Sequence, residues 1–183
     1  APVVLVQPGD AATVTAESAA TVLVAAAPTA GPGVPTRYLD PATRRVEHRG
    51  SGNTARTVHH LLPPDEPAAQ LILVEVYTPG GNWSSYPPHK HDGKDGEPTL
   101  EEVYYYTIDP PQGFGQQILY TNDGETATHS VRDGDAVLLP YGYHPVSAPP
   151  GYRLCYLWGM AGEQRKLALH EDPAHKWIHE AKL

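Results

Sequence analysis

The chain has 183 residues and a mass of 19.8 kDa, with 40% hydrophobic residues and a formal net charge of −8. This length supports one or two small domains with a buried core, and the negative charge argues against nucleic acids and anionic membranes as partners. No apolar run reaches the roughly 18 residues of a membrane-spanning helix. The single cysteine, Cys155, and a start at Ala1 without a basic leader predict a reducing, cytoplasmic location.

Twenty prolines and 17 glycines divide the chain into short segments, which is typical of an all-β fold. Alternating Val and Thr predict three short strands at residues 3–6, 13–15 and 21–26. Such a group is too small to be stable alone. We therefore expect residues 1–27 to pack on the rest of the chain or on another subunit, giving a homo-oligomer of two or more copies. Residues 28–54 are expected to form a linker and connecting segment.

The remaining chain, residues 55–183, is expected to fold as one β-domain. An Asn-Asp-Gly turn at residues 122–124 predicts a hairpin. Strands are predicted at residues 71–77, 103–108, 116–121, 130–131, 136–139 and 153–160. Short strands at such intervals are typical of a barrel or jelly roll, which closes on itself and can hold one ligand in its mouth.

Three histidines and a glutamate in this domain have the spacing of a metal site. His89 and His91 are two residues apart, so in a strand they share one face. Glu102 begins a Val-Tyr strand, and His144 follows a glycine-rich turn. Imidazoles with one carboxylate suit a divalent ion such as zinc, manganese, iron, nickel or cobalt. On spacing alone, Glu101 remains a rival to Glu102.

These segments resemble the two motifs of the cupins, HxH…E and G-x5-P-x-G-x-x-H. Two departures stand out: a longer loop before the glutamate, and one residue instead of two between Gly142 and His144. Both departures are shared by the 5-deoxy-glucuronate isomerase family of myo-inositol breakdown, a neighbour of the 5-keto-4-deoxyuronate isomerases. The resemblance runs from about residue 45 to about residue 177 and is strongest at residues 74–92, 100–106, 112–114, 140–145 and 172–177.

The resemblance implies a cupin fold, a double-stranded β-helix or jelly-roll barrel, with residues 1–27 as the remnant of an N-terminal cupin-like domain. It implies one divalent metal ion bound by a ligand set in which Glu102 is preferred to Glu101. The implied ligands are His89, His91, Glu102 and His144. The implied reaction is the conversion of 5-deoxy-D-glucuronate, a sugar acid, into 2-deoxy-5-keto-D-gluconate, with a Lewis-acid metal stabilising an enediolate.

Other roles stay open. Tyr104, Tyr106 and Tyr143 are the candidate catalytic residues, although Tyr104 and Tyr106 suit an ordinary barrel core equally well. Lys90 is disfavoured as a base because it points away from its histidine neighbours. A cation for the substrate carboxylate is not identified; Arg153 and Lys94 are both open. A 5-keto-4-deoxyuronate isomerase-like enzyme, a cupin dioxygenase and a non-catalytic sugar-binding cupin are the alternative functions.

Overall fold

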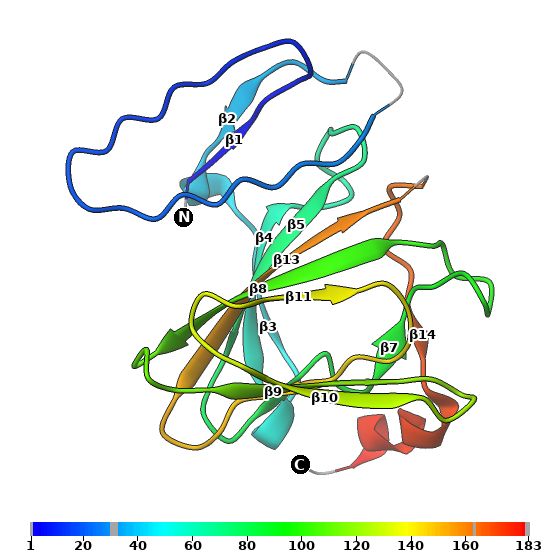
Figure 1. The fold of residues 1–183 in the computed structure, drawn as a ribbon. Coiled ribbons are helices and arrows are strands. Elements are labelled where there is room, and N and C mark those ends of the chain that lie inside the picture. The colour runs from blue at the N-terminus through cyan, green and yellow to red at the C-terminus, as the bar shows by residue number, and fades with distance from the viewer. Residues whose placement is uncertain (1, 30–32, 163, 182–183) are drawn as a thin grey trace.

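The computed structural model describes residues 2–29, 33–162 and 164–181 and shows an almost purely β chain (Figure 1). Its helical elements are three 3₁₀ helices, η1 (Pro41–Thr43), η2 (Gly52–Thr54) and η3 (Pro173–Glu180). Its strands are β1 (Val3–Leu5), β2 (Arg37–Leu39), β3 (Val46–Arg49), β4 (Arg56–Leu62), β5 (Ile72–Thr78), β6 (Trp83–Ser84), β7 (His89–Lys90), β8 (Glu101–Asp109), β9 (Gly115–Tyr120), β10 (Thr126–Val131), β11 (Ala136–Leu139), β12 (Val146–Ser147), β13 (Arg153–Ala161) and β14 (His170–Glu171).

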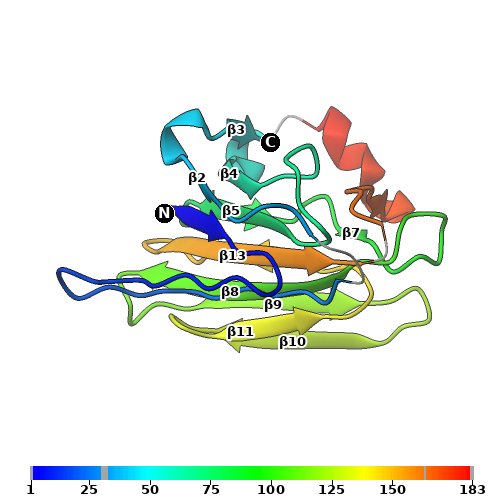
Figure 2. The ribbon, with the colours of Figure 1, turned by 90° about the horizontal axis from the view of Figure 1, so that it is seen from above.

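Two antiparallel sheets form the body of the domain. The larger has the strand order β11-β8-β13-β5-β4-β3, and the smaller has the order β10-β9-β12-β6. Figures 1 and 2 show the two sheets facing each other, with β11 and β10 closing one side. Sequential strands change sheets, for example from β8 to β9 and from β11 to β12, as in a jelly roll.

The hydrophobic core fills the space between the sheets. Val58, Val76 and Tyr106 enter it from the larger sheet, and Val131 and Val146 enter it from the smaller one. All five side chains are almost fully buried. The alternation along β8 explains this arrangement, because every second residue from position 102 to position 108 is buried and the residues between them are less so.

The strands expected after residue 55 are confirmed, with ends shifted by a few residues. β5 is covered on both faces, as its continuous apolar sequence predicts. The Asn-Asp-Gly turn joins β9 to β10, and Gly124 has the positive φ of 95° that such a turn requires. Cys155 is buried in β13. Within the described residues, no helix is long and apolar enough to cross a bilayer.

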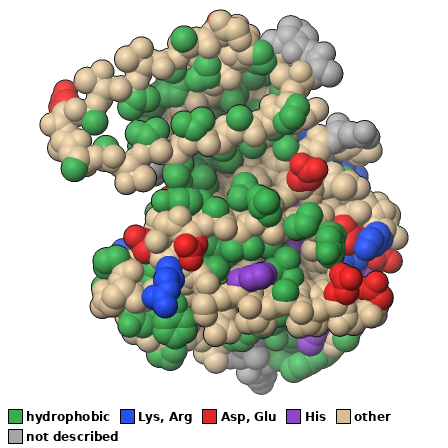
Figure 3. Space-filling view, in the orientation of Figure 1, with side chains coloured by type: hydrophobic (Ala, Val, Ile, Leu, Met, Phe, Trp, Pro, Cys, Tyr) green, Lys and Arg blue, Asp and Glu red, His purple; other side chains and the backbone are tan. Residues whose placement is uncertain are grey.

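The expected strands at residues 13–15 and 21–26 are absent, so that prediction was wrong. Only β1 forms, and it pairs with β2 from the segment expected to be a linker. In Figure 1 the chain between β1 and β2 makes a wide excursion, and hydrophobic side chains lie open on this part of the molecule in Figure 3. Val and Thr favour a strand only where a neighbouring strand supplies hydrogen bonds, and residues 13–26 have none.

Residues 28–54 also contain β3, which pairs with β4 at the edge of the larger sheet. Its sequence is polar, so the expected connecting segment contributes directly to the sheet. The part of that linker at residues 30–32 lies outside the described residues. β1 and β2 cover the outer face of the larger sheet, where Val3, Leu5 and Leu39 pack against Leu61 and Leu73.

Candidate metal centre

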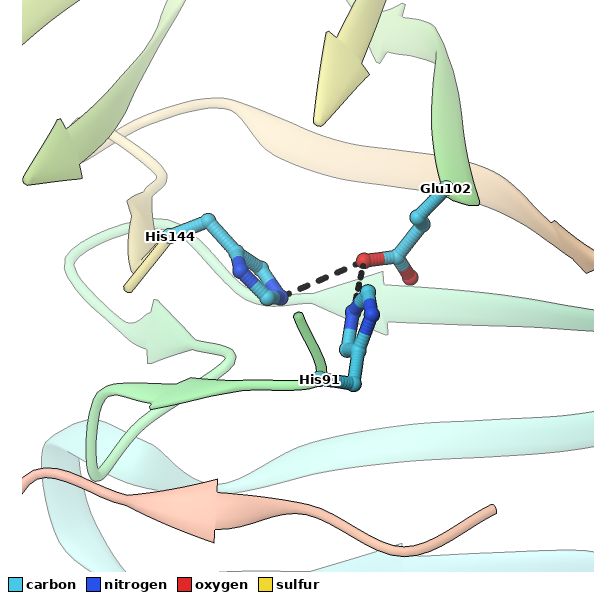
Figure 4. A group of neighbouring side chains, drawn as sticks. All are labelled: His91, Glu102 and His144. Atoms are coloured by element: carbon cyan, nitrogen blue, oxygen red, sulfur yellow. Dashed lines mark hydrogen bonds and ion pairs between the residues drawn. The ribbon is translucent and has the colours of Figure 1, made fainter. Parts of the chain in front are cut away.

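Three of the four predicted ligands meet in the interior. The ligating atoms of His91, Glu102 and His144 all lie within 4.8 Å of one another, and the three side chains are buried. Glu102 Oε2 lies 2.9 Å from His91 Nε2 and 3.2 Å from His144 Nε2 (Figure 4). The histidines approach the carboxylate from two different chain segments, so the group encloses one common point suited to a cation.

Local sequence explains how each side chain arrives there. The alternation of β8 turns Glu102 inward and leaves Glu101 exposed, so the structure brings Glu102 and not Glu101 to the histidines. His144 follows Gly142, which has a φ of 83°. A Cβ at Gly142 would lie 2.7 Å from the Tyr120 carbonyl oxygen, so both the turn and the close approach require glycine.

Main-chain carbonyls hold the outer nitrogen of each histidine. His91 Nδ1 donates to the Leu100 carbonyl at 2.8 Å, and His144 Nδ1 donates to the Gly142 carbonyl at 2.9 Å. His89 Nδ1 lies 3.3 Å from the Pro87 carbonyl. Because a carbonyl oxygen can only accept a hydrogen bond, Nδ1 carries the proton in each ring, and Nε2 keeps a free lone pair. This is the tautomer that a metal-binding histidine needs.

Burial keeps two of these rings neutral. It lowers the pKa of His144 to about 3 against the opposing pull of Glu102, and burial with the nearby His91 lowers the pKa of His89 to about 3. His91 differs: burial acts to lower its pKa, but the hydrogen bond and charge of Glu102 outweigh this and raise it. The His91–Glu102 contact is therefore favourable only with a cation present, either a proton on His91 or a metal ion between the two side chains.

Two polar atoms of the group are buried without a hydrogen bond, namely Glu102 Oε1 and His144 Nε2. A buried acceptor without a donor is costly, and such atoms are rare in folded proteins. A divalent ion would use both, because carboxylate oxygens and imidazole nitrogens are its usual ligands. The residues present therefore fit a metal ion.

His89 lies beside this group but is not part of the compact triad. Its ring centre is 4.9 Å from that of His144, and the rings of His91 and His144 are 5.1 Å apart. Only the other three predicted ligands have their ligating atoms within 4.8 Å of one another. His89 thus borders the same space, and its Nε2 carries a lone pair.

The three predicted tyrosines have different surroundings. Tyr104 lies 6.1 Å from His144 between ring centres, and its hydroxyl is 2.7 Å from Ser85 Oγ. The Tyr106 hydroxyl donates to the side-chain carbonyl of Gln117. Tyr143 instead stacks on Tyr120 at 5.0 Å, and its buried hydroxyl has no well-formed hydrogen bond. The structure therefore brings Tyr104 to the candidate centre and places Tyr143 in a separate aromatic stack.

Lys90 points away from the centre, as strand alternation predicts. Its Nζ contacts Asp92 at 2.5 Å, Asp95 at 2.8 Å and Glu97 at 2.9 Å, and its side chain is only 3% exposed. Hydrogen bonds to these carboxylates overcome the burial and raise the pKa of Lys90. A lysine held in this way stays protonated and is not a base.

Three further residues, Ser85, Tyr156 and Gln117, shape the centre without a motif that marks them in the sequence. Ser85 has a positive φ of 49° and presents its hydroxyl to Tyr104. Tyr156 stacks on Tyr104 at 4.4 Å and bonds to Ser84. Gln117 Nε2 donates to the His144 carbonyl at 2.8 Å and so ties that ligand to β9. Of these, only the inward direction of Tyr156 could have been predicted, from the alternation of side chains along β13.

The two facing sheets and the buried histidine–glutamate group define a cupin. The chain superimposes on a cupin-2 domain from Rhodospirillum rubrum with a TM-score of 0.52, covering 80% of this chain and 87% of that one. The sequences are only 14% identical, so this likeness concerns the fold alone.

Within that class the chain belongs to the KduI/IolB family, whose model matches residues 1–178. A 5-deoxy-glucuronate isomerase of Geobacillus kaustophilus is 53% identical over 152 residues, which are 81% of this chain and 55% of the relative. The crystal structure of an IolB-like protein from Salmonella typhimurium LT2 is 44% identical, with a TM-score of 0.77 over 80% of this chain and 57% of that one. The chain thus spans about half the length of the curated relatives it matches.

Proposed function

We propose that the chain is a metal-dependent aldose–ketose isomerase that converts 5-deoxy-D-glucuronate to 2-deoxy-5-keto-D-gluconate in myo-inositol catabolism. The observation that carries the proposal is the set of histidines whose Nδ1 atoms are fixed by carbonyls while Nε2 lone pairs surround Glu102. The relatives' shared name supplies the substrate.

The ion would be held by His89, His91, Glu102 and His144. Once bound, a divalent ion supplies Lewis-acid polarisation of a substrate carbonyl and its neighbouring hydroxyl. The chain's own contribution is orientation. Main-chain carbonyls fix the rings, and the surrounding sheets exclude water from the buried carboxylate.

The tyrosines would take separate roles. Burial raises the pKa of Tyr104 well above its ordinary value, so its phenol stays protonated at neutral pH and can donate to a substrate oxygen. Tyr106 is better suited to positioning, because it holds Gln117, which in turn holds the His144 carbonyl. Tyr143 would act at most through its stack with Tyr120.

We further propose that the protein forms a homo-oligomer in the cytoplasm. In each chain, residues 1–27 would be the remnant of a cupin-like domain, residues 28–54 the connection, and residues 55–183 the metal-binding domain. Exposed apolar side chains on the excursion support association, including Val14 and Val24, which is 89% exposed. Light scattering at micromolar concentration should report a dimer or larger. A monodisperse monomer would exclude this assembly.

The function is tested by turnover of 5-deoxy-D-glucuronate under anaerobic conditions. Metal-loaded chain should form the keto acid, chelation should abolish turnover, and added divalent ion should restore it. Dependence on oxygen would indicate a dioxygenase instead. Absence of turnover with metal fully bound would favour a sugar-binding cupin.

A further inference from the structure

One half-buried arginine of the larger sheet has no ion pair with any described residue. Val58 on β4 is a core residue. Its cross-strand neighbours in the larger sheet are, in order, Val76, Tyr156 and Tyr106, which are also core residues. Arg56 lies two residues before Val58 and therefore shares its inward face. Its environment is desolvated enough to lower the pKa of the guanidinium. Arg56 is half-buried on this face, so it presents a positive charge toward the space that the sheets enclose.

No described residue neutralises that charge. The one hydrogen bond resolved for Arg56 runs from Nη1 to the Thr54 carbonyl at 2.8 Å, and none of the ion pairs between described residues involves it. Glu47, the carboxylate whose charge acts on Arg56, already accepts two hydrogen bonds from Arg49 and one from His60. A desolvated cation with most of its donors unused is costly unless an anion completes it.

A row of packed side chains leads from the position of Arg56 toward the candidate metal centre. Burial dominates the pKa of Tyr156 and raises it, and the charge of Arg56 opposes that rise. Val58, which follows Arg56 on the same inner face, lies in one cross-strand row with Val76 and Tyr156. Tyr156 in turn stacks on Tyr104, whose ring faces His144. The guanidinium and the histidines therefore border one stretch of the interior.

We infer that Arg56 binds the carboxylate of the sugar acid while the opposite end of that molecule reaches His91, Glu102 and His144. The inference rests on the proposed function and adds the residue that selects an acid over a neutral sugar. A guanidinium suits this role because its planar fork binds a carboxylate through two parallel hydrogen bonds. The other candidates do not fit: Arg153 is 62% exposed and paired with Asp109, and Lys94 is 65% exposed.

The test compares two probes of equal shape, D-glucuronate and its uncharged amide, D-glucuronamide, by calorimetric titration of the metal-loaded chain. We expect the wild type to prefer the acid by at least about tenfold, as a charge-assisted bidentate contact supports. Arg56→Gln should abolish the preference and change the affinity for the amide less than about twofold. Arg56→Lys keeps the charge without the fork and should retain part of the preference. Arg153→Gln is the matched control and should behave as wild type.

The outcomes separate this inference from the proposed function. If Arg56→Gln melts like wild type and still prefers the acid, or if Arg153→Gln loses the preference, the role of Arg56 is overturned. Turnover of 5-deoxy-D-glucuronate with an unchanged KM in Arg56→Gln would also overturn it while leaving the isomerase intact. An Arg56-dependent preference in a chain that isomerises no uronate would overturn the isomerase and keep the carboxylate site. Binding of neither probe by wild type would overturn the carboxylate site.

Discussion

Among the described residues, two groups of acids and histidines each have their ligating atoms within 4.8 Å of one another, yet their chemistry differs. One is the interior triad of His91, Glu102 and His144, and the other is formed by Asp95, Glu97 and His170 near the rim. The second group has Lys90 inserted among its carboxylates, at 2.8 Å from Asp95 and 2.9 Å from Glu97. The first group has no such internal cation.

This difference shows that proximity of ligand types does not define a metal site. In the rim group, the carboxylates are satisfied by Lys90, and the hydrogen bonds lower the pKa of Asp95. In the triad, Glu102 Oε1 and His144 Nε2 remain without partners in a buried space. An external cation would therefore relieve the triad, whereas it would have to compete with a lysine at the rim.

The largest expected effect comes from removing the acid of the triad. Glu102→Gln should lower the affinity for a divalent ion at least about 100-fold, since loss of an outer-shell partner alone costs 10- to 100-fold. The measurement is bound metal per chain after dialysis against limiting zinc. Glu101→Gln is the control, since Glu101 is exposed on the opposite face of the same strand. Metal loss in the Glu101 variant and not in the Glu102 variant would reverse the assignment.

A smaller effect is expected from removing the internal cation. Lys90→Met leaves Asp92 and Glu97 facing each other with side chains only 5% and 4% exposed. Breaking such a buried ion group should cost about 3 kcal/mol of unfolding free energy. Urea titration of Lys90→Met against Lys94→Met measures it, and the exposed Lys94 should contribute less than about 0.5 kcal/mol. Equal stability of the two variants would mean that Lys90 is not the partner of these acids.

The smallest effect is expected from the exposed acid of the rim group. Asp95→Asn should leave both the melting temperature and the bound metal unchanged, because Asp92 and Glu97 still neutralise Lys90. Metal analysis alongside thermal melting checks both quantities. A drop in bound metal would show that the rim group, and not the triad alone, holds an ion.

Much of the candidate site was open to prediction from the sequence because strand parity is rigid. The two-residue period places Glu102 with Tyr104 and separates it from Glu101, and the same period separates Lys90 from its histidine neighbours. Histidine spacing also marked the chain segments that meet. Parity does not specify which of the four candidate ligands form the compact group, so the offset position of His89 required three-dimensional geometry.

Other features depend on partners that composition does not reveal. Residues 13–15 and 21–26 have strand-forming residues but no neighbouring strand, whereas polar β3 pairs because β4 lies beside it. Arg56 gave no signal in the sequence either. Its importance arises from what is missing around it, since Arg49 nearby has Glu47 and Arg56 has no carboxylate among the described residues.

The carbonyl anchors of the histidines have a consequence for how this protein can change. Many metal-binding histidines are oriented by a second side chain, which a single substitution can remove. Here the acceptors for His91 and His144 are the main-chain oxygens of Leu100 and Gly142, and every amino acid carries such an oxygen. Point mutation can therefore replace the candidate ligands, but it cannot delete these two orienting contacts without moving the backbone.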